Sequence, residues 1–191
     1  MYQSETKMTN QIFNATERLM ASEGLHSLSM HKIAKEANIS PGTIYIYFKN
    51  KDELLRRFAR QIFVLFSETL GKNYDESLSF FEQYRRMWWN IWHLLKENPI
   101  IVVNMSQYKS LPAFHETYME HIKQREKDFW GLFCQRGHEA GVLCDLSPEL
   151  LFSLGLKSAI NLALQQLMFN QTLSDQVLET VIERTWRSIQ K

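Results

Sequence analysis

The chain has 191 residues, of which 45% are hydrophobic, 23% charged and 13% aromatic. This composition supplies a sizeable core for one or two domains and excludes a disordered or collagen-like chain. Two cysteines are too few for a disulfide framework, and the first ten residues lack the apolar segment of a secretory signal. The longest apolar-rich stretch, residues 150–168, holds six polar residues, which does not suit a membrane span. We therefore expect a soluble, cytoplasmic protein.

The net charge of +1 is unevenly distributed along the chain. Residues 1–60 hold nine basic and six acidic side chains, a net charge of +3. The remaining 131 residues hold 13 basic and 15 acidic side chains, a net charge of −2. This asymmetry favours an N-terminal end that faces nucleic acid on an otherwise neutral body.

Nearly every segment predicts a helix, because prolines are few and no long run alternates with a period of two. Gly24 and Gly71 stand where helices end, while Ser29 and Ser40 can cap the helices that follow them, the second with Pro41 at its first position. The predicted helices cover, in chain order, residues 9–23, 30–37, a short segment from 41, 51–71, 76–97, 100–108, 113–140, 148–169 and 173–190. The fold class is therefore all-α, with about nine helices.

Two short helices meet across residues 38–39, which is helix-turn-helix spacing. In that arrangement the first helix lies across the DNA backbone and the second enters the major groove. Gly42 permits close approach of the backbone, and Thr43 offers a hydroxyl for a phosphate and a methyl for a thymine. Tyr45 and Tyr47 can reach phosphates through their hydroxyls. The segment therefore predicts a DNA-binding surface.

Residues 12–55 hold an ordered set of motif residues: Ile12, Ala15 and Gly24; Ser29, Ile33-Ala34 and Ala37-Asn38-Ile39-Ser40; and Gly42-Thr43-Ile44-Tyr45, Tyr47-Phe48-Lys49-Asn50-Lys51 and Leu54-Leu55. With these residues the segment resembles the N-terminal domain of the TetR family of bacterial transcriptional regulators. The resemblance covers about a quarter of the chain, and the remainder matches the family only in length and helical layout.

The resemblance implies a helix-turn-helix DNA-binding domain over residues 1–52 and a helical ligand-binding and dimerisation domain over residues 53–191. The residues that it implies for DNA contact are His31, Ser40, Pro41, Gly42, Thr43, Tyr45, Ile46 and Tyr47, with Lys51 on a phosphate. A helix N-terminus with a lysine beside it favours phosphate on physical grounds as well. Ile46 is apolar and cannot form a hydrogen bond with a base, so in the groove it can contact only a methyl group. Base recognition would therefore depend on His31 and Thr43 and partly on DNA shape.

Some of these side chains also have a structural interpretation. Tyr45 and Phe48 could belong only to the core, and His31, Lys49 and Lys51 could be ordinary surface residues. The ordered run of these residue types is difficult to explain by packing alone, which favours DNA binding.

The rest of the chain is rich in aromatic residues and methionine, which are typical of pockets for small molecules. The family resemblance implies such a pocket between helices four to eight, although an aromatic residue at helical spacing is also typical of a core. A hydrophobic effector is expected, either aromatic or cationic, since cations bind aromatic faces, or fatty-acyl. The candidate ligand-binding residues are Phe66, Trp88, Trp92, Met105, Tyr108, Phe114, Tyr118, His121 and Phe129, with Asn104 as a second polar candidate beside His121.

Helices eight and nine (148–169 and 173–190) complete the predicted chain. Helix eight is apolar nearly all round, so it must be covered on more than one side. The family resemblance implies a two-fold homodimer through these helices, which would place two recognition helices about 34–36 Å apart on a palindromic operator. Gly155 and Ala159, four residues apart, suit either close helix approach or a small-residue core.

No constellation of catalytic or metal-binding residues stands out. His115 and His121 are six residues apart and cannot bind one ion from the same helix face. Cys134 and His138, with Cys144 nearby, have a zinc-compatible spacing, but a buried thiol beside a surface histidine is the more ordinary arrangement. A phosphate-binding glycine loop and a nucleophile elbow are both missing from the sequence. We expect neither enzymatic activity nor a cofactor or metal.

The sequence therefore predicts a ligand-responsive DNA-binding transcriptional regulator, a repressor released from a palindromic operator by a hydrophobic small molecule. Two alternatives remain open: a helical small-molecule carrier, and a DNA-binding regulator that responds to a protein partner or to a redox signal at Cys134 or Cys144.

Overall fold

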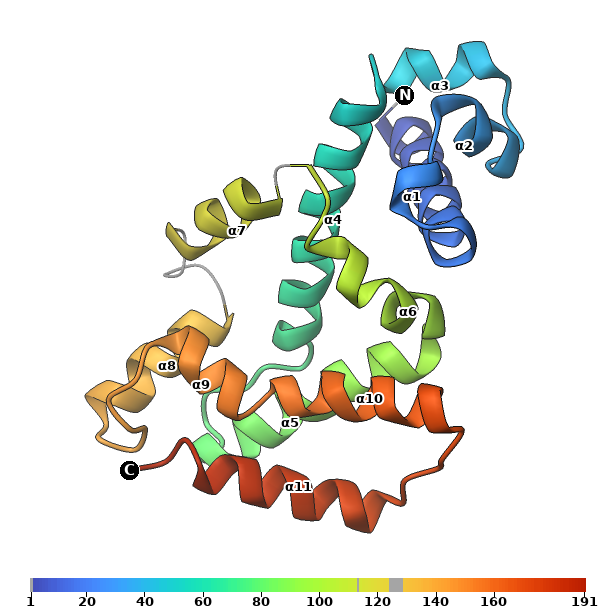
Figure 1. Ribbon diagram of the computed structural model, residues 1–191. Helices are drawn as coiled ribbons and strands as arrows, with labels where there is room; N and C mark the ends of the chain where they lie inside the picture. Colours follow the sequence, from blue (N-terminus) through green and yellow to red (C-terminus); the bar gives the residue numbers. More distant parts are fainter. Residues whose placement is uncertain (1, 113, 124–128) are drawn as a thin grey trace. The chain divides into compact units, whose positions relative to one another are not determined.

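The computed structural model describes residues 2–112, 114–123 and 129–191 (Figure 1). In these residues the regular elements are α-helices and one short 3-10 helix, without a β-strand, which confirms the predicted all-α fold. The helices are α1 (Tyr2–Glu23), α2 (Met30–Glu36), α3 (Pro41–Tyr47), α4 (Lys51–Gly71), α5 (Phe80–Glu97), α6 (Pro99–Tyr108), α7 (Phe114–Lys123), α8 (Phe129–Glu139), α9 (Pro148–Leu154), α10 (Lys157–Phe169) and α11 (Asp175–Arg187), and the 3-10 helix is Leu25–Ser27.

Several helix boundaries differ from those predicted; the predicted helix 76–97, for example, begins at Phe80 as α5. Helix α1 begins at Tyr2 instead of residue 9. The predicted helix 113–140 is described as α7 and α8, and residues 113 and 124–128 of that prediction lie outside the described part. The predicted helix 148–169 breaks at Gly155, where the backbone is not helical (φ −104°, ψ −95°). A Cβ at Gly155 would lie 3.1 Å from the Tyr84 ring, so Gly155 serves close packing within the chain.

The chain folds into two compact units, one of residues 1–63 and 103–119 and the other of residues 64–102 and 120–191. Helices α4 and α6 each contribute residues to both units. Each helix described here is too short or too polar to cross a membrane.

The core of the first unit joins α1, α2 and α3 to the first half of α4. The Phe13 ring lies 5.7 Å from that of Phe48 and 5.6 Å from that of Phe58. Aliphatic side chains from all four helices fill the remaining space and are buried: Ile12, Ala15, Leu19, Ile33, Ala34, Ile44, Leu54 and Leu55. Burial of these apolar side chains is the main stabilising contribution for a small helical unit.

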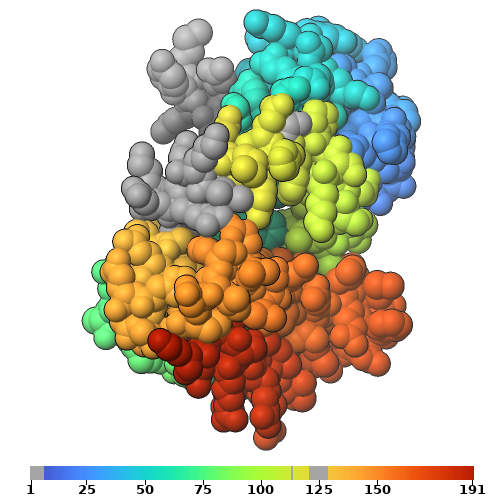
Figure 2. All heavy atoms as spheres, turned by 60° about the vertical axis from the view of Figure 1, so that its left-hand side comes forward, coloured from blue at the N-terminus to red at the C-terminus, as the bar shows by residue number. Residues whose placement is uncertain are grey.

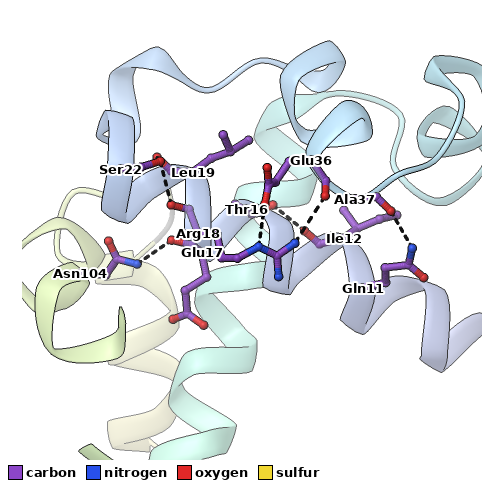
Figure 3. Close-up of polar contacts among 10 residues, drawn as sticks. All are labelled: Gln11, Ile12, Thr16, Glu17, Arg18, Leu19, Ser22, Glu36, Ala37 and Asn104. Carbon is purple, nitrogen blue, oxygen red and sulfur yellow. Dashed lines mark hydrogen bonds and ion pairs between the residues drawn. The ribbon is translucent and has the colours of Figure 1, made fainter. Parts of the chain in front are cut away.

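Polar contacts fix the orientation of α1 against its neighbours (Figure 3). The Gln11 side chain donates to the carbonyl oxygen of Ala37 at 2.6 Å, and the Arg18 guanidinium pairs with Glu36 at 2.6 Å. These bonds join α1 to the C-terminal end of α2. Because an exposed pair such as Arg18–Glu36 contributes little free energy, its effect is mainly on geometry.

Helix α5 is the centre of the second unit, where it packs against α10 and α11. The indole of Trp88 donates to the Ser158 hydroxyl at 2.7 Å, and the hydroxyls of Tyr84 and Thr185 bond at 2.7 Å. The buried residues of α5 recur at helical spacing: Gln83, Tyr84, Met87, Trp88, Ile91, Trp92 and Leu95. Tyr84, Trp88 and Trp92 are therefore core residues, whereas the other aromatic residues of α5, Phe80, Phe81 and Trp89, are half-buried.

Candidate nucleic-acid interface

A tight turn joins α2 to α3. Asn38 has a left-handed backbone (φ 53°), which asparagine tolerates better than most residues. The amides of Asn38 and Ile39 donate to the carbonyl oxygens of Lys35 and Ala34, each at 3.0 Å. The two helices therefore meet at residues 38–39, as the helix-turn-helix spacing predicted.

Local capping sets the first turn of α3. The Ser40 hydroxyl accepts a hydrogen bond from the Thr43 amide at 3.0 Å and bonds the Thr43 hydroxyl at 2.7 Å. Pro41 occupies the first helical position, where a missing N–H is harmless. The Thr43 hydroxyl keeps hydrogen-bonding capacity beside this bond to Ser40, so both the hydroxyl and the methyl group of Thr43 can contact a partner.

Helix α3 has a buried face and an uncovered face. Ile44 and Phe48 are buried, which confirms the core interpretation of Phe48. Tyr45 and Ile46 are 56% and 78% exposed, so Tyr45 is not a core aromatic. Tyr47 is half-buried. The predicted residues Ser40, Pro41 and Gly42 are exposed, and Thr43 is half-buried.

Arg57 of α4 holds the C-terminal end of α3. Its guanidinium donates to the carbonyl oxygen of Tyr47 at 3.0 Å and lies 4.6 Å from the centre of the Phe48 ring. The bond to the carbonyl satisfies a group that the end of a helix leaves without a partner. The sequence analysis did not identify Arg57, because nothing local links it to a carbonyl ten residues earlier.

His31 and Lys51 lie at the starts of α2 and α4. His31 is exposed, and the Lys51 ammonium donates to the carbonyl oxygen of Leu28 at 3.1 Å, just before α2 begins. An ammonium has three N–H donors, so two remain for another acceptor. Asn50 precedes α4, and its side chain accepts from the Glu53 amide in the first turn at 2.9 Å.

Taken together, these side chains present hydroxyl, imidazole and ammonium donors with exposed apolar groups between them. Such a mixture suits phosphate oxygens and base edges, which offer acceptors and methyl groups.

Among the described residues, no three His, Cys, Asp or Glu side chains cluster closely enough to hold a metal ion. The imidazole of His138 meets the carbonyl oxygen of Cys144 at 3.0 Å, and Cys134 is buried.

The candidate ligand-binding residues fall into two groups. Trp88, Trp92 and Tyr108 are buried. Trp88 and Trp92 stack at 5.7 Å, and Tyr108 donates through its hydroxyl to the Glu17 carboxylate. The half-buried residues are Phe66, Met105, Phe114, Tyr118 and Phe129. The side chain of His121 lies outside the described part of the chain.

Helix α6 is bonded to α1 through Asn104, which the sequence analysis had assigned to a pocket, and through Gln107, which it had not identified. The Asn104 amide donates to the carbonyl oxygen of Glu17 at 2.9 Å (Figure 3), and the Gln107 amide donates to that of Met20 at 2.9 Å. Gln107 also accepts from the amide of Leu25 at 2.8 Å. Burial raises the pKa of Glu17, and the hydrogen bond from Tyr108 partly offsets that increase.

Comparisons with known proteins match both parts of the chain. Residues 12–58 match the family described as "Bacterial regulatory proteins, tetR family", and residues 79–190 match "Tetracyclin repressor-like, C-terminal domain". An uncharacterized HTH-type transcriptional regulator of Haemophilus influenzae is 53% identical over 191 residues, covering 100% of both chains.

Solved structures agree with these sequence matches. A TetR-family regulator from Haemophilus influenzae has a TM-score of 0.92 at 53% identity, covering 99% of this chain and 100% of its own. A TetR-family protein from Vibrio parahaemolyticus has a TM-score of 0.78 at 28% identity, with coverage of 96% and 99%. FadR from Bacillus subtilis, solved with stearoyl-CoA, shares the fold with a TM-score of 0.72 at 22% identity over 92% and 96% of the two chains.

Proposed function

Because the chain belongs to the TetR family of DNA-binding transcriptional regulators, whose members are typically ligand-responsive repressors, we propose which residues perform each part of that function. The exposed face of α3, with His31 and Lys51, binds the major groove and the phosphates beside it. Helices α9, α10 and α11 form a homodimer. A hydrophobic small molecule bound by the helices that follow the DNA-binding domain releases the operator.

The uncovered face of α3 is the observation that carries the DNA-binding assignment. A seven-residue helix that buries Ile44 and leaves Tyr45 and Ile46 in water has more apolar surface outside than folding requires. The exposed apolar side chains are removed from water only when a partner molecule binds this face. A DNA major groove admits an α-helix and offers both acceptors and methyl groups.

Lys51 supplies the phosphate contact in this proposal. Its bond to Leu28 holds the ammonium at the start of α2. A lysine kept in place beside a duplex neutralises one phosphate in each subunit and thereby releases a condensed counterion. The positive charge of Lys51 strengthens binding to every DNA sequence, whereas the side chains of α3 distinguish one DNA sequence from another.

Exposed apolar side chains on α9, α10 and α11 support the homodimer. These helices lie next to one another on one face, drawn in orange and red in Figure 2. The exposed large hydrophobic residues on them are Leu150, Leu154, Leu164, Leu167, Met168, Phe169 and Val177. A second copy covers such a self-complementary face by two-fold symmetry and presents a second α3 to a palindromic site.

The half-buried aromatic residues and Met105 are the better candidates for effector contact. Trp88, Trp92 and Tyr108 already have partners inside the protein, so a ligand would have to displace packed groups to reach them. Phe66 and Phe129, by contrast, are only partly covered. A hydrophobic effector gains affinity by covering such surface.

Two helices are suited to couple effector to operator. Helix α4 runs without a break from Lys51 to Gly71, and α6 is bonded to α1 through Asn104, Gln107 and Tyr108. A displacement of either helix would change the position of α3. A coupling free energy of about 1–3 kcal/mol would weaken operator binding about 5–150-fold.

Substitution of Lys51 tests the DNA-binding assignment. Lys51→Ala should lower affinity for every duplex and reduce the dependence of log affinity on log salt by about one phosphate for each subunit, while Lys51→Arg should restore both. Lys96→Ala, which removes an exposed lysine of α5, is the matched control. Wild-type salt dependence in Lys51→Ala, with the fold confirmed by circular dichroism, would contradict the assignment.

A further inference from the structure

Gly42 has no role inside the protein that requires glycine. Its backbone is not in the left-handed region, and a Cβ at this position would meet nothing closer than the Ser40 hydroxyl oxygen at 3.7 Å. Glycine inside a helix lowers stability relative to alanine, because it leaves the unfolded chain more freedom. The reason for glycine therefore lies outside the chain, where a partner comes close to the backbone of α3.

Ile46 stands one turn further along the same face. It is 78% exposed, the largest value among the exposed large hydrophobic residues of the described chain, while Ile44 on the opposite face is fully buried. Side chains on a helix lean toward its N-terminus, so the Ile46 side chain extends over the turn that contains Gly42. Gly42 and Ile46 therefore form one exposed stretch of α3 that lacks hydrogen-bonding side chains, and this pair of residues is called the notch from here on.

The chemistry of the notch selects what can fill it. Isoleucine neither donates nor accepts a hydrogen bond, so Ile46 cannot read the polar atoms of a base edge. In the major groove of DNA, thymine alone among the four bases presents an apolar group, its C5-methyl. We propose that the notch recognises a thymine methyl in each half-site, with Gly42 allowing the approach and Ile46 covering the methyl. This inference rests on the DNA-binding function proposed above and specifies the operator chemistry.

Thr43 is the competing reader of the same methyl. Its side chain carries a methyl group beside the hydroxyl that bonds Ser40. Thr43 is half-buried whereas Ile46 is almost fully exposed, so Ile46 offers the larger surface to a base. The experiment must therefore separate these two residues.

Replacing thymine with deoxyuracil removes only the methyl group and keeps the base pair intact. A duplex selected from a random pool by the wild-type protein would be resynthesised with deoxyuracil at each thymine in turn. Burial of one methyl contributes about fourfold in affinity, so one position in each half-site should show that loss, and about 15-fold when both are replaced. In Ile46→Ala the loss at these positions should fall below about twofold.

Two variants act as controls for folding and for position. Ile100→Ala truncates the same residue type where it is exposed on α6, and it should keep the wild-type response to deoxyuracil. Gly42→Ala should fold at least as stably as the wild type yet bind the selected duplex about tenfold more weakly, because its Cβ occupies the notch. Wild-type affinity in Gly42→Ala would overturn the proposed approach at that residue.

The remaining outcomes separate the inference from the function on which it rests. If the wild-type protein tolerates deoxyuracil at every position, the methyl reading is wrong although DNA binding stands. If Ile46→Ala loses as much affinity as the wild type at the same thymine, another residue reads the methyl, and Thr43→Ser would identify it. Failure to select any duplex would refute the inference together with the proposed function.

Discussion

Replacing Tyr108 with phenylalanine removes one oxygen atom, the hydroxyl that donates to the half-buried Glu17 carboxylate. A hydrogen bond to a charged group contributes about 1.5–3 kcal/mol to folding. Tyr108→Phe should therefore lower the free energy of unfolding by about 2 kcal/mol at neutral pH. For a chain of this size the melting temperature should fall by about 4–8 °C.

The pH dependence of this loss distinguishes the carboxylate bond from simple packing. Burial already raises the pKa of Glu17 above its ordinary value of 4.5, and loss of the Tyr108 hydroxyl raises it further. Stability linked to a raised carboxyl pKa is present in acid and is lost as the pH rises through the pKa of the folded state. The deficit of the variant should therefore be smallest at or below pH 4.5, where Glu17 is protonated, and should grow as the pH rises through the pKa of Glu17 in the folded protein.

Urea unfolding at fixed protein concentration, repeated across this pH range, would measure the effect. A double-mutant cycle with Glu17→Gln isolates the pair, and the loss caused by Tyr108→Phe should shrink to about 1 kcal/mol when the acceptor is neutral. Tyr118→Phe, on a ring that packs against Phe63, is the control. A deficit that is equal at all pH values, or unchanged in the Glu17→Gln background, would refute the reasoning.

Three further substitutions have expected outcomes. Ser40→Ala removes the cap on the Thr43 amide and should destabilise the protein by about 1 kcal/mol, as thermal unfolding would measure; an unchanged melting temperature would count against the cap. Leu167→Lys places a charge on the exposed face of α10 and should yield a monomer by light scattering, whereas a persistent dimer would exclude this face. Glu179→Gln should cost less than about 1 kcal/mol at neutral pH, because the pair is partly exposed. The Arg85 guanidinium lowers the pKa of Glu179, so this stability should disappear as the pH falls through that pKa, and a deficit that persists in acid would contradict the assignment.

The helix-turn-helix could be predicted because its determinants are local. Ser29 and Ser40 cap amides three residues ahead, and Asn38 turns the chain between the two helices. Each of these effects depends on the chemistry of a few neighbouring residues. Such signals can be recognised in a single sequence, and the same helix-turn-helix residues carry the resemblance to the TetR family.

Contacts between distant residues could not be predicted in this way. Tyr108 and Glu17 are 91 residues apart, and an aromatic residue at helical spacing fits a pocket as well as it fits a core. The interpretation of Trp88 as a pocket residue met the same difficulty, since its bond to Ser158 depends on how α5 packs against α10. The break at Gly155 likewise depends on the Tyr84 ring, which no pattern within residues 148–169 reveals.

Selection of duplexes from a random pool, followed by affinity measurements at several salt concentrations, tests the central claim most directly. A dimeric regulator that reads DNA with α3 should enrich a two-fold-symmetric site with half-site centres about 10 base pairs, or a multiple of that spacing, apart. Affinity for this site should fall steeply and linearly on logarithmic axes as salt rises. Weak binding at every salt concentration with no enriched sequence, from protein freed of bound small molecules, would contradict the account.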